Sequence, residues 1–95
     1  MATTTIAVDV PSDEWTEIVD GDDYESVGLQ VTSVQGAAIA IAATEPAADS
    51  ADFVIVGASA LSLFVPIALA AGDLIYARGI NGEATIRLYQ VERAA

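Results

Sequence analysis

The sequence contains no cysteine and no histidine, and its only basic residues are three arginines. Without cysteine the chain has no disulfide, no thiolate zinc ligand and no cysteine nucleophile. Without histidine it lacks the side chain that most often serves as a general base, a metal ligand or a switch near neutral pH. The serine and threonine hydroxyls have no histidine or lysine to activate them. We therefore expect no enzymatic activity, no cofactor and no metal.

Positive charge is also scarce, because 14 acidic residues against 3 arginines give a net charge of −11. A phosphate backbone would meet like charge, so we expect no nucleic-acid partner. The charge is uneven along the chain. Many of the acidic residues lie within residues 9–25, whereas the three arginines, Arg78, Arg87 and Arg93, all lie near the C-terminus.

The length of 95 residues allows one small domain. Hydrophobic residues make up 54% of the chain and charged residues 18%, which is too apolar for an intrinsically disordered protein. Much of the apolar fraction is alanine, which fills little volume. A thin core favours burial against neighbouring copies, so we expect a homo-oligomer.

Near its start the chain has a segment in which large aliphatic residues occupy every second position. In residues 5–10, Ile6, Val8 and Val10 share one face, and Pro11 ends the pattern. Residues 1–11 are thus an extended N-terminal arm or a first strand, and residues 12–95 form a single β-sandwich domain. Residues 15–19 form a second short strand, with one helical turn over residues 13–20 as the alternative.

Two hairpins are predicted further along. Residues 26–32 alternate, turn at residues 35–37 and return through residues 38–43 as an alanine-rich strand. Asn81-Gly82 is a strong hairpin signal that would join residues 74–79 to residues 84–89. These segments predict an all-β fold: a small antiparallel sandwich or barrel of about seven to eight short strands with the extended N-terminal arm.

The predicted second hairpin has two different faces. One face is apolar and pairs Ile75 with Leu88 and Ala77 with Ile86. The other face is amphipathic and favours a partner interface, because tyrosine and arginine are enriched where protein surfaces meet. This face carries Tyr76, Arg78, Arg87 and Tyr89.

Residues 53–72 form a run of twenty residues without charge, long enough to cross a bilayer as a helix. No basic residue lies near the run to set an orientation, and glycine, serine and Pro66 interrupt it. The alternative is a continuous apolar strand over residues 53–56 and a second strand over residues 60–65 that ends at the proline. We favour the strands and expect no membrane association.

Two further features offer both a functional and a structural explanation. The acidic turn over residues 20–25 has the composition of part of a calcium loop but lacks EF-hand spacing, and a solvated turn explains it better. Trp15 is the sole tryptophan. The structural explanation makes Trp15 a core or lid residue, and the functional explanation makes it an interface anchor.

Residues 72–79 read Gly-Asp-Leu-Ile-Tyr-Ala-Arg-Gly, and residues 81–89 read Asn-Gly-Glu-Ala-Thr-Ile-Arg-Leu-Tyr. This run resembles the closing hairpin of small tailed-phage virion proteins. Residues 26–43 and the following Glu45-Pro46 loop are similar to the central segment of the same proteins. The resemblance spans about half of the chain by its strand and turn signals, and the first strand has no counterpart in it.

The resemblance implies a head decoration (cement) or head-fibre protein, in which an oligomeric β-sandwich sits on the outer surface of the capsid and clamps neighbouring major capsid subunits. A trimer is favoured by analogy with such modules. The expected partners are the major capsid protein and further copies of the chain. A fibre or tail-associated module that binds host glycans is the alternative, and a small membrane protein spanning residues 53–72 is the second.

The N-terminal segment is a candidate capsid-binding arm that adds a strand to its partner, and removing residues 1–10 is expected to abolish binding while leaving the fold intact. No residue is predicted to be catalytic. The candidate partner-interface residues are Ile6, Val8, Val10, Trp15, Tyr76, Arg78, Arg87 and Tyr89.

Overall fold

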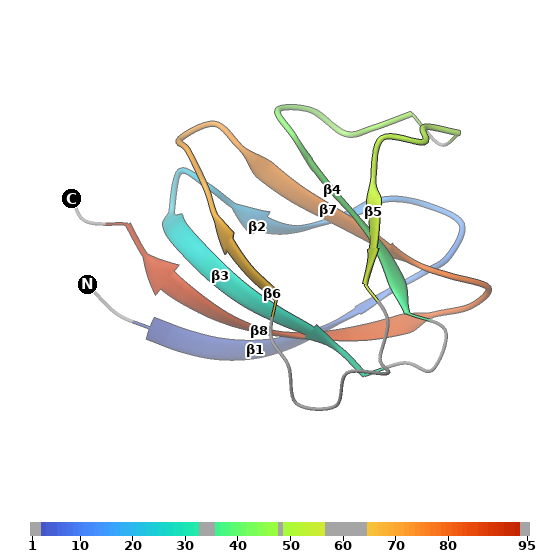
Figure 1. Cartoon of the computed structure of the whole chain (residues 1–95), viewed down its shortest axis with the longest axis horizontal. Coiled ribbons are helices and arrows are strands. Elements are labelled where there is room, and N and C mark those ends of the chain that lie inside the picture. Colours follow the sequence, from blue (N-terminus) through green and yellow to red (C-terminus); the bar gives the residue numbers. More distant parts are fainter. Residues whose placement is uncertain (1–2, 33–35, 48, 57–64, 94–95) are drawn as a thin grey trace.

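The computed structural model describes residues 3–32, 36–47, 49–56 and 65–93, and these residues form two packed four-stranded antiparallel sheets (Figure 1). The first sheet has the order β1-β8-β3-β6, and the second has the order β2-β7-β4-β5. The predicted all-β sandwich is confirmed. The strands are β1 (Thr3–Val10), β2 (Thr16–Asp20), β3 (Tyr24–Val31), β4 (Ala37–Ala42), β5 (Val54–Val56), β6 (Val65–Ala68), β7 (Leu74–Gly79) and β8 (Ala84–Glu92).

The core lies between the two sheets and follows the alternation of the strands. In β8, Ile86 and Leu88 are buried while Arg87 between them is exposed. Each fully buried aliphatic side chain contributes roughly 2 kcal/mol to folding. The largest fully buried side chains are Leu29, Ile75, Ile86, Leu88, Val10 and Val27.

The two predicted hairpins are wrong in their pairing, although their strands exist. β7 pairs with β2 and β4 in the second sheet, whereas β8 pairs with β1 and β3 in the first. Asn81 and Gly82 do reverse the chain, with φ values of 56° and 147°. The reversal carries the chain from one sheet to the other. Strands β3 and β4, which were predicted to form the other hairpin, likewise belong to different sheets, and residue 35 of the turn predicted at residues 35–37 lies outside the described residues.

The physical reason for both errors is competition from distant strands. Ile75 lies opposite Ile41 of β4 on one side and opposite Val19 of β2 on the other. Both edges of β7 are therefore paired, and no edge remains for β8. At the β7–β8 corner, a Cβ added to Gly79 would collide with the carbonyl oxygen of Gly82. The corner is therefore tighter than a side chain at residue 79 would allow.

The N-terminal segment is a strand of the first sheet. β1 pairs with β8 over its whole length, from Thr3 opposite Val91 to Val10 opposite Ala84. The Thr85 hydroxyl donates a hydrogen bond of 2.7 Å to the Asp9 carboxylate across this pair. Because Val10 is fully buried and β1 is paired along its length, we now expect removal of residues 1–10 to disrupt the fold.

Three further local predictions can be compared with the structure. Residues 16–20 form strand β2, so the alternative helical turn is wrong. Residues 54–56 form β5 within the predicted apolar strand, but most of the strand predicted over residues 60–65 lies outside the described residues. Pro66 lies inside β6 instead of ending a strand, and β6 is an edge strand, where a missing N–H is tolerated. No helix long and apolar enough to cross a membrane occurs in the described residues.

Candidate functional site

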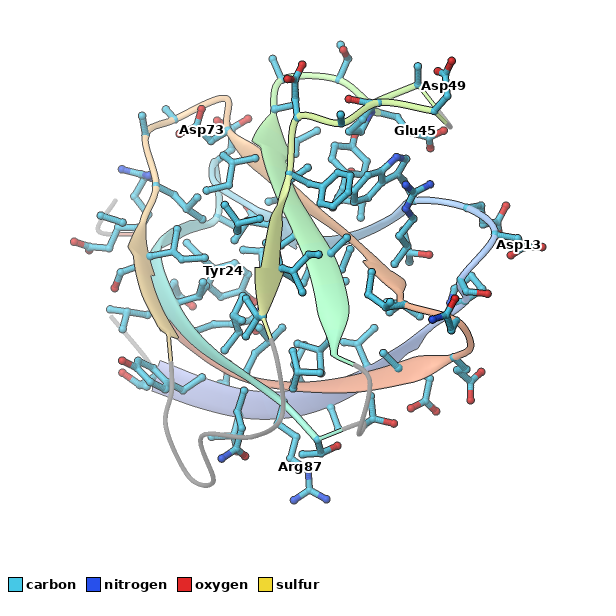
Figure 2. All side chains as sticks on the ribbon, turned by 45° about the vertical axis from the view of Figure 1, so that its right-hand side comes forward. Asp13, Tyr24, Glu45, Asp49, Asp73 and Arg87 are labelled. Atoms are coloured by element: carbon cyan, nitrogen blue, oxygen red, sulfur yellow. The ribbon has the colours of Figure 1, made fainter. Side chains whose placement is uncertain are left out.

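The predicted interface face is divided between opposite sides of the sandwich. Tyr76 and Arg78 project from the outer face of the second sheet, because Ile75 and Ala77 point into the core. Arg87 and Tyr89 project from the outer face of the first sheet, and Figure 2 shows Arg87 pointing away from the molecule. The four side chains do not form one surface. This prediction is wrong because it depended on the β7–β8 hairpin.

Trp15 is the centre of a small second core on the outer face of the second sheet. Only 5% of its surface is exposed, and it packs with Ala38, Ala40 and Tyr76. Its indole Nε1 donates a hydrogen bond of 3.2 Å to the carbonyl oxygen of Ala47 in the loop between β4 and β5. Trp15 therefore holds this loop against the sheet, which agrees with the lid interpretation.

Arg78 and Phe53 complete this cluster. The Arg78 guanidinium carbon lies 4.6 Å from the centroid of the Trp15 ring and 5.6 Å from that of Phe53. The two ring centroids are 5.8 Å apart at an interplanar angle of 59°. A cation over an aromatic face is attracted by the negative charge of that face. Arg78 thus has a structural role here.

Tyr76 belongs to the same cluster, with the acidic residues Glu17 and Glu45 in its surroundings. Burial raises the pKa of the Tyr76 phenol above its ordinary value, and the negative charges of Glu17 and Glu45 raise this pKa further. All three effects oppose the phenolate. The neutral phenol is therefore the form that the folded protein stabilises.

The outer face of the first sheet carries a shallow hollow of about 400 Å³ beside β1. Arg87 is exposed there and lies opposite Ala7 on one side and Gln30 on the other. The small Ala7 side chain leaves the space open. The hollow is lined by Thr5, Ile6, Ala7, Gln30, Arg87 and Leu88.

Tyr89 is fixed on this outer face by a glycine. It lies opposite Gly28 of β3, and a Cβ added to Gly28 would fall inside the Tyr89 ring. The absence of a side chain at residue 28 therefore lets the tyrosine ring lie flat on the sheet. Flat packing leaves Tyr89 half-buried, so little of the ring is available as an interface anchor.

β1 is an edge strand with one side unpaired in the described part of the chain. Its three predicted interface residues point toward the core side of the sheet, as expected from their alternation, but they are covered unequally. Val10 is buried, Val8 is half-buried and Ile6 is 41% exposed. The accessible part of the predicted surface is the first half of β1, next to the hollow.

The structure also reveals an apolar edge that sequence reasoning missed. Val54 and Ile55 of β5 are 65% and 63% exposed, and Ile41 of β4 is 47% exposed. Between β5 and β6, a groove of about 350 Å³ separates Val54 and Ile41 from Ile67 of the first sheet. A continuous apolar strand predicts burial on both faces. The only feature of the sequence that could have indicated this exposed apolar edge is the absence of charge in residues 53–72.

The acidic turn uses its carboxylates in local hydrogen bonds. Asp20 Oδ1 accepts a 2.9 Å bond from the Asp22 N–H, and Asp22 Oδ1 accepts a 2.8 Å bond from the Gly72 N–H. The Arg93 side chain donates to the carbonyl oxygens of Gly21 at 2.9 Å and Leu69 at 2.7 Å. Within the described ranges, no three potential metal-ligating side chains gather. The geometry fits a turn tied to the C-terminal strand.

Comparison with known proteins gives no relative. The chain matches no family model, no curated protein and no solved structure at a significant level.

Proposed function

We propose that this chain is a non-enzymatic phage virion protein that decorates the outer surface of the capsid by binding the major capsid protein, and that it acts as a homo-oligomer. The free edge of β1 is the observation that carries the proposal. It offers eight residues of strand paired on one side, with exposed Ile6 beside the hollow of Arg87.

An unpaired strand edge binds an extended segment of another chain through main-chain hydrogen bonds, and pockets for alternate side chains give specificity. The β1 edge has both components, because Ile6 supplies an apolar contact and the hollow can receive a side chain from the partner. Arg87 adds a positive charge to this surface, in a chain that has only three basic residues. An acidic side chain of the capsid protein would be complementary to it.

The contact made by one β1 edge is small, so we expect modest affinity per copy. Several copies held in one oligomer would bind a repeating lattice much more tightly than a single copy does. This is how a small module of this shape would stabilise a shell.

The test is co-sedimentation of the purified protein with capsids assembled from the major capsid protein of the same phage. The wild type should sediment with the capsids. Ile6→Lys places a charge on the core side of an edge strand, which prevents strand addition, and should weaken binding about tenfold, equivalent to ~1.4 kcal/mol. Ser12→Lys makes the same change in charge at an exposed residue after β1 and should bind like the wild type.

Absence of wild-type binding would overturn the proposed function. Binding of Ile6→Lys at wild-type strength would overturn the assignment of the β1 edge instead. Circular dichroism of both variants verifies that each one is folded.

A further inference from the structure

The four edge strands of the sandwich differ in what protects them. β2 carries Glu17 and Asp20, and β6 contains Pro66. β1 carries Asp9 only near its C-terminal end, beyond the first half of the strand that is proposed to bind the capsid protein. Charged residues and proline are the devices that keep an edge strand from pairing with another chain. β5 has neither, since it consists of Val54, Ile55 and Val56.

β5 is also the most exposed apolar segment of the described chain. Val54 and Ile55 project to opposite faces of the strand, and each exposes more than half of its surface. Figure 1 shows β5 and β6 on the same side of the sandwich. Within the described residues, β5 pairs only with β4, and the groove lies between β5 and β6.

We propose that β5 pairs antiparallel with β5 of a second copy, so that the second sheets of the two copies become one continuous sheet across a two-fold axis. This inference goes beyond the proposed capsid binding and does not depend on it. The same patch on both subunits makes the contact self-complementary, and a two-fold contact closes as a dimer.

The position of the acidic residues favours this arrangement. Asp52 lies three positions before Ile55. With the two-fold axis at Ile55, the Asp52 residues of the two copies are six positions apart, or about 20 Å at about 3.3 Å per residue. That separation exceeds the screening length of about 8 Å at physiological salt. A parallel pairing would bring the two Asp52 residues side by side.

The acidic residues of the opposite edge strand are distant from this contact. β2, with Glu17 and Asp20, is the opposite edge of the second sheet, three strand spacings or about 14 Å from β5. Glu17 and Asp20 therefore add little repulsion at β5, and the acidic residues nearest to the contact are Asp52 and Glu45, which line one hollow with Ile41. The pairing places Val54 opposite Val56 of the second copy and Ile55 opposite itself. It also brings together the two open grooves, each with its own Ile41 and Ile67.

Native mass by light scattering after gel filtration, over a range of protein concentrations, is the first test. The wild type should have the mass of a dimer. Ile55→Lys places two lysines directly opposite each other, which destabilises a strand pair, and should give a monomer. Ile6→Lys is the matched control, because it makes the same change on the other exposed edge strand and should leave the mass of a dimer.

A cysteine substitution tests the register, since the chain has no cysteine of its own. Residues opposite each other in an antiparallel pair have Cα atoms about 4.5–5.5 Å apart, which suits a disulfide. Ile55→Cys should therefore form a covalent dimer on mild oxidation, and the control Ile6→Cys should not. Higher salt should strengthen the wild-type dimer, because salt screens the repulsion between two acidic copies.

A monomeric wild type would overturn the proposal, and so would a trimer, which needs a contact that is not two-fold. A dimer broken by Ile6→Lys but not by Ile55→Lys would place the contact at β1 and overturn it as well. Weaker association at higher salt would also overturn it, because attraction between opposite charges would then hold the copies together instead of the apolar β5 strands. A monomer would also contradict the homo-oligomer of the proposed function, whereas capsid binding through β1 is tested separately by co-sedimentation.

Discussion

At the scale of single residues, the cluster around Trp15 links three parts of the chain. Trp15 precedes β2, Arg78 lies in β7 and Phe53 precedes β5. None of these residues is adjacent in sequence, so their contact depends on the strand order of the second sheet. The sequence singled out Trp15 and Arg78 individually, but no local pattern indicates that they meet.

Arg78→Met removes the cation above the Trp15 ring while keeping much of the apolar side chain. We expect the free energy of unfolding to fall by about 1 kcal/mol, the value typical of a partly covered cation–π pair. Trp15 fluorescence during urea unfolding measures it directly. Arg87→Met is the matched control on the opposite sheet and should change stability by less than about 0.5 kcal/mol. Equal effects of the two substitutions would contradict the role given to Arg78.

Tyr76 predicts a dependence on alkaline pH. Burial first, and then Glu17 and Glu45, raise the pKa of its phenol in the folded state above that in the unfolded chain, about 10. The folded protein then keeps a proton that the unfolded chain has lost. The stability that Tyr76 contributes is fully present below pH about 10 and is lost as the pH rises through the raised pKa of the folded state.

Tyr76→Phe has no such proton to lose. Urea midpoints measured from about pH 8 to about pH 11 should fall more steeply for the wild type than for Tyr76→Phe above pH about 10. Parallel curves would show that burial does not hold this phenol neutral. The two proteins share every other ionisable group, so the difference between the curves isolates Tyr76.

At the scale of elements, the sequence indicated the strands and their faces better than their partners. The alternation of Ile6, Val8 and Val10 correctly placed these side chains on one face of β1, and the structure shows that this face is the core side. Asn81-Gly82 correctly indicated a reversal of the chain. A reversal of this kind serves both a hairpin and a crossing between sheets. Whether the chain forms a hairpin or crosses to the other sheet depends on strands that are distant in sequence. The residues of the turn alone do not determine it.

Deletion of residues 1–10 should now abolish the fold along with any capsid binding. It removes β1 from the edge of the first sheet, exposes one side of β8 and takes fully buried Val10 out of the core. Loss of one large buried aliphatic side chain alone costs about 2–5 kcal/mol, a large share of the stability of a small domain. Thermal unfolding followed by circular dichroism measures the effect. A cooperative transition at the wild-type temperature would mean that β1 contributes nothing to the sandwich.

At the scale of the whole molecule, composition and alternation were sufficient to predict an all-β sandwich, because few architectures bury so many short alternating segments. They did not predict which apolar strand remains exposed. Val54, Ile55 and Val56 read as a buried strand, yet β5 ends the second sheet. Exposure of an edge is a property of the complete strand order, which the sequence of one segment does not contain.

The pairing of the first and last strands has a mechanical consequence. Thr3 lies opposite Val91, so both ends of the chain leave the sandwich on the same side, as Figure 1 shows. A force that pulls these two ends apart would open the hydrogen bonds between β1 and β8 one after another, starting at that side. Resistance to such tension would be low, because no two of these bonds carry the load together. A force that presses on the face of the sheet would instead act on the packed core between the two sheets, so the sandwich should resist pressure from that direction better than tension between its ends.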